Sequence, residues 1–261
     1  MSHFDAIIIG AGFAGLYQLH TLRDKLKLNC HVFETGSGVG GTWFWNRYPG
    51  AKCDTESHAY CYYFNKKIYE KWNWSERYPS QKEIESYLNF VANELSLFRS
   101  ISFSSKVIEL IYNDSKNLWS VKLENGKLFQ CRFIITALGC LSTSNEPLIP
   151  GIKNFCNKVI HSSSWPEELK LHDKNIGIIG YGIQGRAQAL NLRDSGLNVR
   201  IGNRKDSYAD EVVKDGFEIH NPKEVADWAD IIMFLIPDDA QTEVYDRWIK
   251  PDEFFVLRKR G

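Results

Sequence analysis

The chain has 261 residues, and its 32 lysine and arginine side chains are balanced by 32 aspartate and glutamate side chains. Because there is no excess of positive charge to attract a polyanion, we expect no nucleic-acid partner. A hydrophobic content of 43% excludes a disordered chain. The length suits two domains better than one, since a domain usually has roughly 100 to 200 residues.

The cysteines and the N-terminus predict where the protein resides. The six cysteines form no CxxC pair and no spacing typical of zinc ligands, so we expect free thiols in a reducing compartment and no metal site. The first apolar run, residues 6–9, is too short for a secretory signal. No stretch approaches the ~20 apolar residues that span a bilayer, so we expect a cytoplasmic protein without membrane contact.

The first motif is a glycine-rich turn between a strand and a helix. Residues 5–10 are apolar, as in a buried parallel strand, and a helical leucine pattern follows. Three glycines separate the two elements at the spacing GxGxxG: Gly10, Gly12 and Gly15. A second strand, 31–33, ends at Glu34. This order predicts a Rossmann-like unit whose glycines admit a pyrophosphate and whose Glu34 accepts adenosine ribose hydroxyls. The alternative is a tight turn followed by a surface acid.

The next stretch is rich in glycine and aromatic residues. It reads Gly38-Val39-Gly40-Gly41-Thr42-Trp43-Phe44-Trp45 and continues Asn46-Arg47-Tyr48-Pro49-Gly50-Ala51-Lys52-Cys53-Asp54. With these motifs residues 1–166 resemble the flavin-dependent Baeyer–Villiger monooxygenases, members of the class B flavoprotein monooxygenases. The resemblance implies FAD as a cofactor. Beyond the turn and Glu34, its candidate contacts are Thr42, Trp43, Phe44, Trp45, Asp54, Tyr60 and Val107.

Asp54 is the candidate catalytic residue, because the resemblance places it near the flavin. A short acid after a Pro-Gly turn is more often a solvated loop residue or a cap, and both interpretations stay open. The aromatic residues between Trp43 and Trp74 have a similar alternative. We expect most of them in the core and only a few at the flavin or at a substrate.

The rest of the first domain combines one helix with several short strands. We expect a helix over 81–97 and then a small antiparallel insertion. The insertion comprises four expected strands: 101–103, 107–112, 119–123 and 128–132. Residues 133–139 return to the pattern of a buried strand. We place the FAD-binding domain at 1–145 and a linker at 146–174.

The linker carries the fingerprint FxGxxxHxxxW of the Baeyer–Villiger enzymes at Phe155, His161 and Trp165, with Asn157 in place of its glycine. Asparagine tolerates a positive φ better than most other residues do. A lone histidine is more often a hydrogen-bonded structural residue than a proton carrier. The resemblance likewise implies that His161 serves domain movement more than chemistry.

A second strand, glycine turn and helix begin at residue 175. The turn contains Gly180, Gly182 and Gly185, and a further strand covers 197–201. Its end carries Arg204, Lys205 and Ser207 where the first unit has an acid. Arginine and lysine bind phosphate, so this loop predicts recognition of a 2′-phosphate and hence NADPH in preference to NADH. The alternative is a solvated basic turn.

The amino-acid sequence of the second unit resembles a different family. Residues 180–196 and 229–241 are similar to the N-terminal NADPH-binding domain of ketol-acid reductoisomerase. The resemblance implies NADPH contacts along the turn and at the start of a later helix, namely Tyr181, Ile183, Gln184, Asp238 and Gln241. We place this domain at 175–251 and a tail at 252–261.

The fold class expected is therefore α/β, with two Rossmann-like dinucleotide-binding units that have parallel sheets, the first with a small antiparallel insertion. The favoured function is an FAD- and NADPH-dependent oxidoreductase, in which NADPH reduces FAD and a flavin peroxide oxygenates a ketone or heteroatom compound with O₂. We also expect parts of both families' catalytic apparatus to be missing. The alternatives are a reductoisomerase-like protein acting on acetohydroxy acids, or a non-catalytic nucleotide-binding fusion product.

Overall fold

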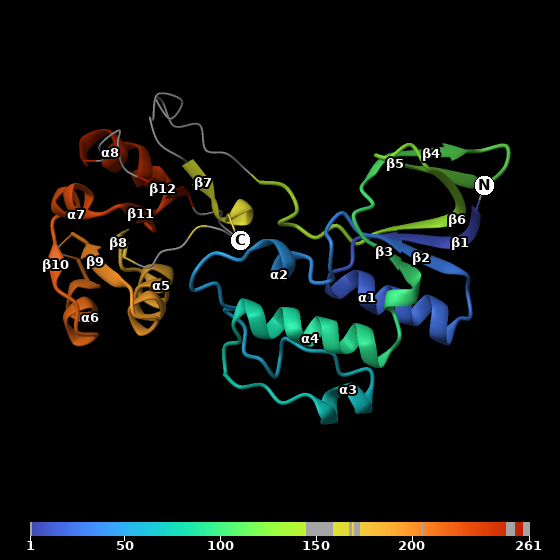
Figure 1. The fold of residues 1–261 in the computed structure, drawn as a ribbon, viewed down its shortest axis with the longest axis horizontal. Coiled ribbons are helices and arrows are strands. Elements are labelled where there is room, and N and C mark those ends of the chain that lie inside the picture. Colours follow the sequence, from blue (N-terminus) through green and yellow to red (C-terminus); the bar gives the residue numbers. More distant parts are fainter. Residues whose placement is uncertain are drawn as a thin grey trace. The chain divides into compact units, whose positions relative to one another are not determined.

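The computed structural model describes residues 2–144, 159–166, 169, 173–204, 206–248 and 254–257. The chain divides into two compact units, the first of residues 1–45 and 52–143 and the second of residues 46–51 and 144–261. Each unit has a six-stranded sheet with helices packed on it (Figure 1). The α/β class and the two Rossmann-like units are confirmed.

The first unit begins with the strand, turn and helix that the sequence predicts. Its helical elements are α1 (Phe13–Leu19), the π-helical η1 (His20–Lys25), α2 (Thr42–Trp45), α3 (Lys66–Lys71), α4 (Gln81–Glu94) and the 3₁₀ turn η2 (Phe98–Ser100). Its strands are β1 (Ser2–Ile9), β2 (Cys30–Phe33), β3 (Ile101–Ser102), β4 (Val107–Asn113), β5 (Leu118–Leu123) and β6 (Leu128–Thr136).

The first sheet has the order β3-β2-β1-β6-β5-β4 and joins a parallel half to an antiparallel half. Ile8 of β1 lies in register with Val32 on one side and with Ile135 on the other, both in parallel strands. Helices α1 and α4 pack their apolar faces on this half, where Leu16 and Leu88 are fully buried. The carboxyl ends of β1 and β2 therefore meet beside the N-terminus of α1.

The sheet differs in two respects from the antiparallel insertion that we expected from the sequence. Strand β3 is not antiparallel, because Val32 and Phe33 of β2 pair with it in parallel. The segments 128–132 and 133–139 are not two strands, because residues 128–136 form the single strand β6. Strand β6 pairs in parallel with β1 and antiparallel with β5. The antiparallel part thus contains β4, β5 and one edge of β6.

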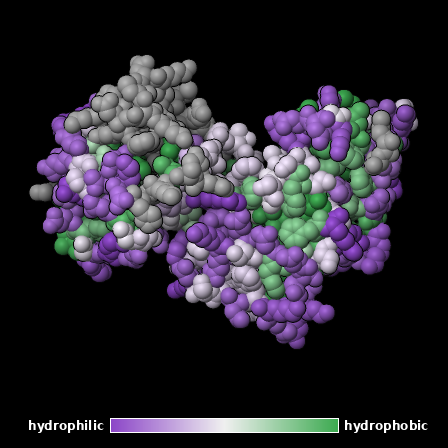
Figure 2. Space-filling model, viewed as in Figure 1, coloured by the Kyte–Doolittle hydropathy of each residue, from purple (hydrophilic) through white to green (hydrophobic). Residues whose placement is uncertain are grey.

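The expected burial of residues 133–139 is also wrong in part. Ile134 and Ile135 pack on the two apolar cores, but Phe133 is 52% exposed and Leu138 is 54% exposed. A continuously apolar strand is buried on both faces only where other elements cover it. Among the described residues nothing covers Phe133, whose ring lies 5.3 Å from the Arg132 guanidinium carbon. Hydrophobic residues reach the surface of the first unit on the face shown in Figure 2.

The second unit alternates strands and helices along the chain. Its strands are β7 (Val159–His161), β8 (Asn175–Ile179), β9 (Asn198–Gly202), β10 (Ile219–His220), β11 (Ile231–Phe234) and β12 (Phe254–Leu257). Its helical elements are the 3₁₀ turn η4 (Ser162–Ser164), α5 (Ile183–Asp194), α6 (Ala209–Lys214), α7 (Pro222–Trp228) and α8 (Asp238–Trp248).

All strands of the second sheet are parallel, in the order β10-β9-β8-β11-β12-β7. Helices lie on both faces, since α5 and α6 pack over Ile176 and Ile178 while α7 packs over Ile179 and Ile232. Strand β7 comes from the segment expected to be a linker and β12 from the expected tail. Residues 155 and 157 of the fingerprint lie outside the described residues.

None of the helices in the described part of the chain has both the length and the apolar composition needed to cross a membrane. Within the same residues, no group of three or more His, Cys, Asp and Glu side chains is placed to hold a metal ion.

Arg23 in η1 forms hydrogen bonds with the C-terminal end of α4. We use this contact for a prediction about stability. Its guanidinium donates to the carbonyl oxygens of Leu95 and Ser96, at 2.9 and 3.0 Å, and its side chain is 12% exposed. We expect Arg23→Ala to lower the free energy of unfolding of the first unit by about 1–3 kcal/mol, because two carbonyl groups lose hydrogen bonds from a charged and largely buried donor. Urea unfolding measures the change.

Lys82→Ala, at an exposed position in the first turn of the same helix, is the matched control. Its expected effect is within about 0.5 kcal/mol. Equal effects of the two variants would contradict the capping role of Arg23.

Candidate functional site

The glycine turn of the first unit brings α1 close against the sheet. Gly10 has a φ of +104°, and a Cβ there would lie 2.6 Å from the Ala137 oxygen. A Cβ on Gly15 would lie 1.9 Å from the Gly10 oxygen. Gly12 has an ordinary φ of −81° and faces the Gly41 Cα. Gly10 and Gly15 are thus required by packing, and no acid lies in the first turn of α1 to oppose an anion.

Glu34 joins the two glycine loops at the end of β2. Its Oε2 accepts a hydrogen bond from the Ala11 N–H at 2.6 Å, and its Oε1 accepts one from the Gly36 N–H at 2.7 Å. The residue is only 6% exposed. A carboxylate has about four acceptor positions, so these two bonds leave capacity for ribose hydroxyls. The position fits the adenosine end of a dinucleotide.

The aromatic segment after the glycines is partly structural. Trp43 is 9% exposed and donates from Nε1 to the Tyr60 hydroxyl at 3.0 Å. The Phe44 ring lies against Gly36, where a Cβ would be 2.7 Å from it. Thr42 begins α2, and Trp45 at its end is 45% exposed. Trp43 and Phe44 therefore stabilise the glycine-rich segment that precedes α2 by packing inside the first unit.

Asp54 lies in an exposed turn after the buried Cys53. Burial has the largest effect on the pKa of Tyr60 and raises it, the hydrogen bond from Trp43 lowers it, and the negative charge of Asp54 is among the smaller influences that raise it. The structure thus joins Trp43 and Tyr60 by a hydrogen bond and leaves Asp54 exposed in the turn after Cys53. Val107, by contrast, is partly buried in the apolar cluster between β2 and β5.

Two tyrosines that we did not select from the sequence hold the start of α1. The Tyr62 hydroxyl donates to the Phe13 oxygen at 2.5 Å, and the Tyr62 N–H donates to the Tyr87 hydroxyl at 2.7 Å. Burial raises the pKa of both tyrosines, so both stay neutral. The signal available was the aromatic run 60–64 followed by a tyrosine on the buried face of α4.

The glycine turn of the second unit repeats the packing of the first. Gly180 has a φ of +99°, and its Cβ would lie 2.8 Å from the Leu235 oxygen. A Cβ on Gly185 would lie 2.2 Å from the Gly180 oxygen. Gly182 differs, because its φ is −67° and a Cβ would meet no atom within 4 Å. Neither backbone conformation nor protein packing requires a glycine there, which leaves the approach of a ligand as the reason.

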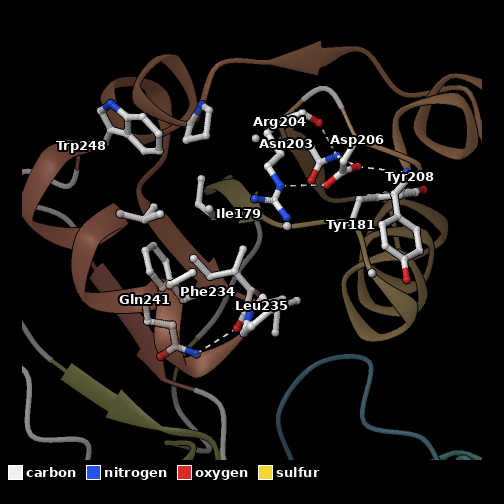
Figure 3. Close-up of a pocket in the computed structure, with 18 of the residues that line it drawn as sticks. Ile179, Tyr181, Asn203, Arg204, Asp206, Tyr208, Phe234, Leu235, Gln241 and Trp248 are labelled. Carbon is white, nitrogen blue, oxygen red and sulfur yellow. Dashed lines mark hydrogen bonds and ion pairs between the residues drawn. The ribbon is translucent and has the colours of Figure 1, made fainter.

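A pocket of about 910 Å³ opens at the carboxyl ends of β8, β9 and β11, within the second unit (Figure 3). Of the residues expected from the sequence, seven line it: Gly180, Tyr181, Gly182, Ile183, Gln184, Arg204 and Gln241. Gly185 packs beneath the turn, and Ser207 is exposed on the loop beside the pocket. Lys205 and the side chain of Asp238 lie outside the described residues.

Tyr181 directs its side chain into the core. It is 1% exposed, and its hydroxyl donates to Asp215 Oδ2 at 2.9 Å. Arg186 donates to both oxygens of Asp215, from Nε at 2.5 Å and from a terminal nitrogen at 2.9 Å. These bonds connect the glycine turn and α5 to the end of α6. Tyr181 can therefore contact a bound dinucleotide through its backbone, while its side chain positions the turn.

Comparison with known proteins identifies the family. The model of the L-lysine 6-monooxygenase/L-ornithine 5-monooxygenase family matches residues 55–202, and that of an NAD(P)-binding Rossmann-like domain matches residues 8–72. A Baeyer-Villiger monooxygenase from Pseudooceanicola batsensis is 46% identical over 70% of this chain and 33% of its own length. The chain belongs to the class B flavin monooxygenases. Residues 170–253 match the NADPH-binding domain of acetohydroxy acid isomeroreductase, so the suspected composite is confirmed.

Other relatives agree with this family assignment. Cyclohexanone 1,2-monooxygenase from Acinetobacter sp. is 37% identical over 86% of this chain and 41% of its own length. A cyclohexanone monooxygenase mutant from Rhodococcus sp. Phi1, solved with NADP⁺, matches with a TM-score of 0.70 and 36% identity over 80% of this chain and 40% of that one. The chain thus spans about a third to two fifths of the length of these relatives.

The pocket of the second unit also contains residues that the sequence did not single out. Among them are Asn203, Asp206, Tyr208, His220 and Trp248. Asn203 and Asp206 flank the predicted Arg204 and were available from the same loop. His220 and Trp248 reach the pocket from β10 and α8, and no local motif marks them.

The contrast between Gly182 and Gly185 gives a binding prediction. We expect Gly182→Ala to leave the melting temperature within a few degrees of wild type but to weaken NADPH binding at least about tenfold, because the new Cβ occupies ligand space. Gly185→Ala is expected to destabilise the second unit by several kcal/mol through its clash with the Gly180 oxygen. Calorimetry measures both quantities, and wild-type NADPH affinity in Gly182→Ala would contradict the assignment.

Asp215 gives a pH prediction. The hydrogen bonds from Arg186, opposed by burial and assisted by Tyr181, lower the pKa of Asp215 to about 2. Since an unfolded aspartate titrates near pH 4, this stabilisation is present above pH 4 and is lost as the pH falls towards 2. Urea unfolding of wild type and Asp215→Asn should therefore differ most near neutral pH and converge in acid. The exposed Asp194→Asn is the control, with an expected difference that is small at every pH.

Proposed function

We propose that this chain provides the FAD-binding and NADPH-binding units of a flavin-dependent monooxygenase that oxygenates a ketone or a heteroatom compound with O₂. The observation that carries the proposal is a pair of equivalent glycine turns with opposite charges at the ends of the following strands. Glu34 follows β2 in the first unit and Arg204 follows β9 in the second. Glutamate there favours a ribose with free hydroxyls, as in FAD, and arginine favours a 2′-phosphate.

The residues of the first unit fit FAD. The turn between β1 and α1 leaves backbone N–H groups for a pyrophosphate, and Glu34 accepts the ribose hydroxyls. Trp43, held by its hydrogen bond to Tyr60, would position the residues from Thr42 to Trp45 along the flavin. Asp54, the candidate catalytic residue, would supply a negative charge that adjusts the flavin electrostatically. Val107, within the apolar cluster, is the candidate contact that the structure supports least.

The residues of the second unit fit NADPH. Its pyrophosphate would be held at the N-terminus of α5, where Gly182 leaves room and no acid is present in the first turn. Arg204 and Lys205 would bind the 2′-phosphate, with Ser207 as a further donor. Gln184 and Gln241 line the same pocket and would contact the rest of the dinucleotide, for which Asp238 is a further predicted contact. When both cofactors are bound, NADPH supplies the reducing equivalents and FAD the oxygen-transfer chemistry.

The reductoisomerase alternative has less support. Its match is confined to residues 170–253 and describes a cofactor-binding domain. The relatives that match across both units are named monooxygenases. The similarity of residues 170–253 to an isomeroreductase domain therefore supports binding of NADPH, but it does not support the isomeroreductase reaction.

A thermal-shift titration tests the cofactor assignments. We expect FAD to raise the melting temperature of the first unit and NADPH that of the second, because a ligand at 100 times its Kd stabilises by about 2.7 kcal/mol. Glu34→Ala should reduce the FAD shift and leave the NADPH shift intact. If FAD produces no shift and purified protein carries no flavin absorbance, the flavoprotein proposal is wrong.

A further inference from the structure

The loop between β9 and α6 carries an acid beside its arginine. Asp206 lines the pocket with Asn203 and Arg204 (Figure 3). Its Oδ1 accepts hydrogen bonds from Asn203 Nδ2 and from the Tyr208 N–H, both at 3.0 Å. Its Oδ2 accepts one from Arg204 Nε at 3.3 Å. Oδ1 therefore stabilises the conformation of the loop, and Oδ2 binds the guanidinium group of Arg204.

Asp206 is the fixed member of this pair. Its side chain is 24% exposed and makes three hydrogen bonds, whereas the side chain of Arg204 is 87% exposed. Burial raises the pKa of Asp206, but the bonds from Tyr208, Asn203 and Arg204 outweigh burial and leave that pKa below its usual value. The carboxylate is therefore ionised at neutral pH, and Arg204 is the exposed partner that a ligand can reach.

This arrangement affects the two nicotinamide dinucleotides differently. The 2′-phosphate of NADPH would share the positive charge of Arg204 with the carboxylate of Asp206, and it would lie near that carboxylate, whose negative charge repels it. The 2′-hydroxyl of NADH carries no charge and can donate a hydrogen bond to the carboxylate, as in NAD-binding Rossmann units. The same acid thus opposes one cofactor and tolerates the other.

From this geometry we infer that Asp206 is a specificity-determining residue, which lowers the preference for NADPH over NADH below the level that Arg204 alone would produce. The inference rests on the proposed function, in which this pocket takes NADPH. It differs from that proposal because it concerns the ratio of two affinities and not the existence of the site.

Asp206→Asn is the decisive variant. The asparagine keeps Oδ1 as acceptor for Asn203 and Tyr208, and it replaces the oxygen facing Arg204 by an amide group that cannot accept. We expect the Kd for NADPH to fall about fivefold, since partly exposed ion pairs contribute on the order of 1 kcal/mol. The Kd for NADH should stay the same or rise. Isothermal calorimetry on the full chain measures both.

Two controls separate this role from a purely structural one. Asp210→Asn removes the same charge at an exposed position in the first turn of α6, and it should leave the affinity ratio unchanged. Arg204→Ala should cost more NADPH affinity in the Asp206→Asn background than in wild type, because there the guanidinium no longer shares its charge with a carboxylate. Equal costs in the two backgrounds, together with an unchanged affinity ratio in Asp206→Asn, would overturn the inference.

The remaining outcomes are also decisive. If Asp206→Asn weakens NADPH and NADH by the same factor, the residue only shapes the loop and the inference is wrong. If wild type binds NADH and NADPH equally and Asp206→Asn changes neither, the inference fails while dinucleotide binding stands. If wild type binds neither dinucleotide, the proposed function fails together with the inference.

Discussion

The close approach of each glycine turn to its own helix and sheet is the constraint on which the rest of the structure depends. Gly15 and Gly185 lie so near the oxygens of Gly10 and Gly180 that a methyl group would overlap them. Because no side chain intervenes, α1 and α5 pack directly on the strands that precede them. The N-termini of both helices consequently lie at the sheet edge where the parallel strands end. That edge is where a phosphate group meets unpaired N–H groups.

The two units use the same constraint for different ligands. In the first unit the strand after the helix ends at Glu34, which both glycine loops hold through backbone N–H groups. In the second unit the corresponding strand ends at a loop with Arg204 and Asp206. In the proposed assignment the architecture sets where a dinucleotide binds, and Glu34 and Arg204 set which dinucleotide it is. Asp206 accepts a hydrogen bond from Arg204, so the two side chains of that loop also act on each other.

A second set of polar contacts holds each turn in place from inside the core. Tyr62 reaches the first residue of α1, and Tyr181 reaches Asp215 at the end of α6. In both cases a buried hydroxyl is satisfied by one specific partner, and leaving such a group unpaired costs more than the bond contributes. Buried tyrosine side chains therefore help to position both turns, in addition to the close packing of their glycines.

The sequence by itself determined both Rossmann-like units, the positions of their glycine turns and the charges at the strand ends. These features follow from local spacing, because a strand, a turn and a helix each depend on residues close in the chain. Only the tertiary structure decided that β3 joins β2 in parallel, that Phe133 is exposed and that Tyr181 points inward. It also decided that the Tyr181 hydroxyl meets Asp215. Strand partners, burial and side-chain direction depend on residues distant in the chain, and spacing carries no information about them.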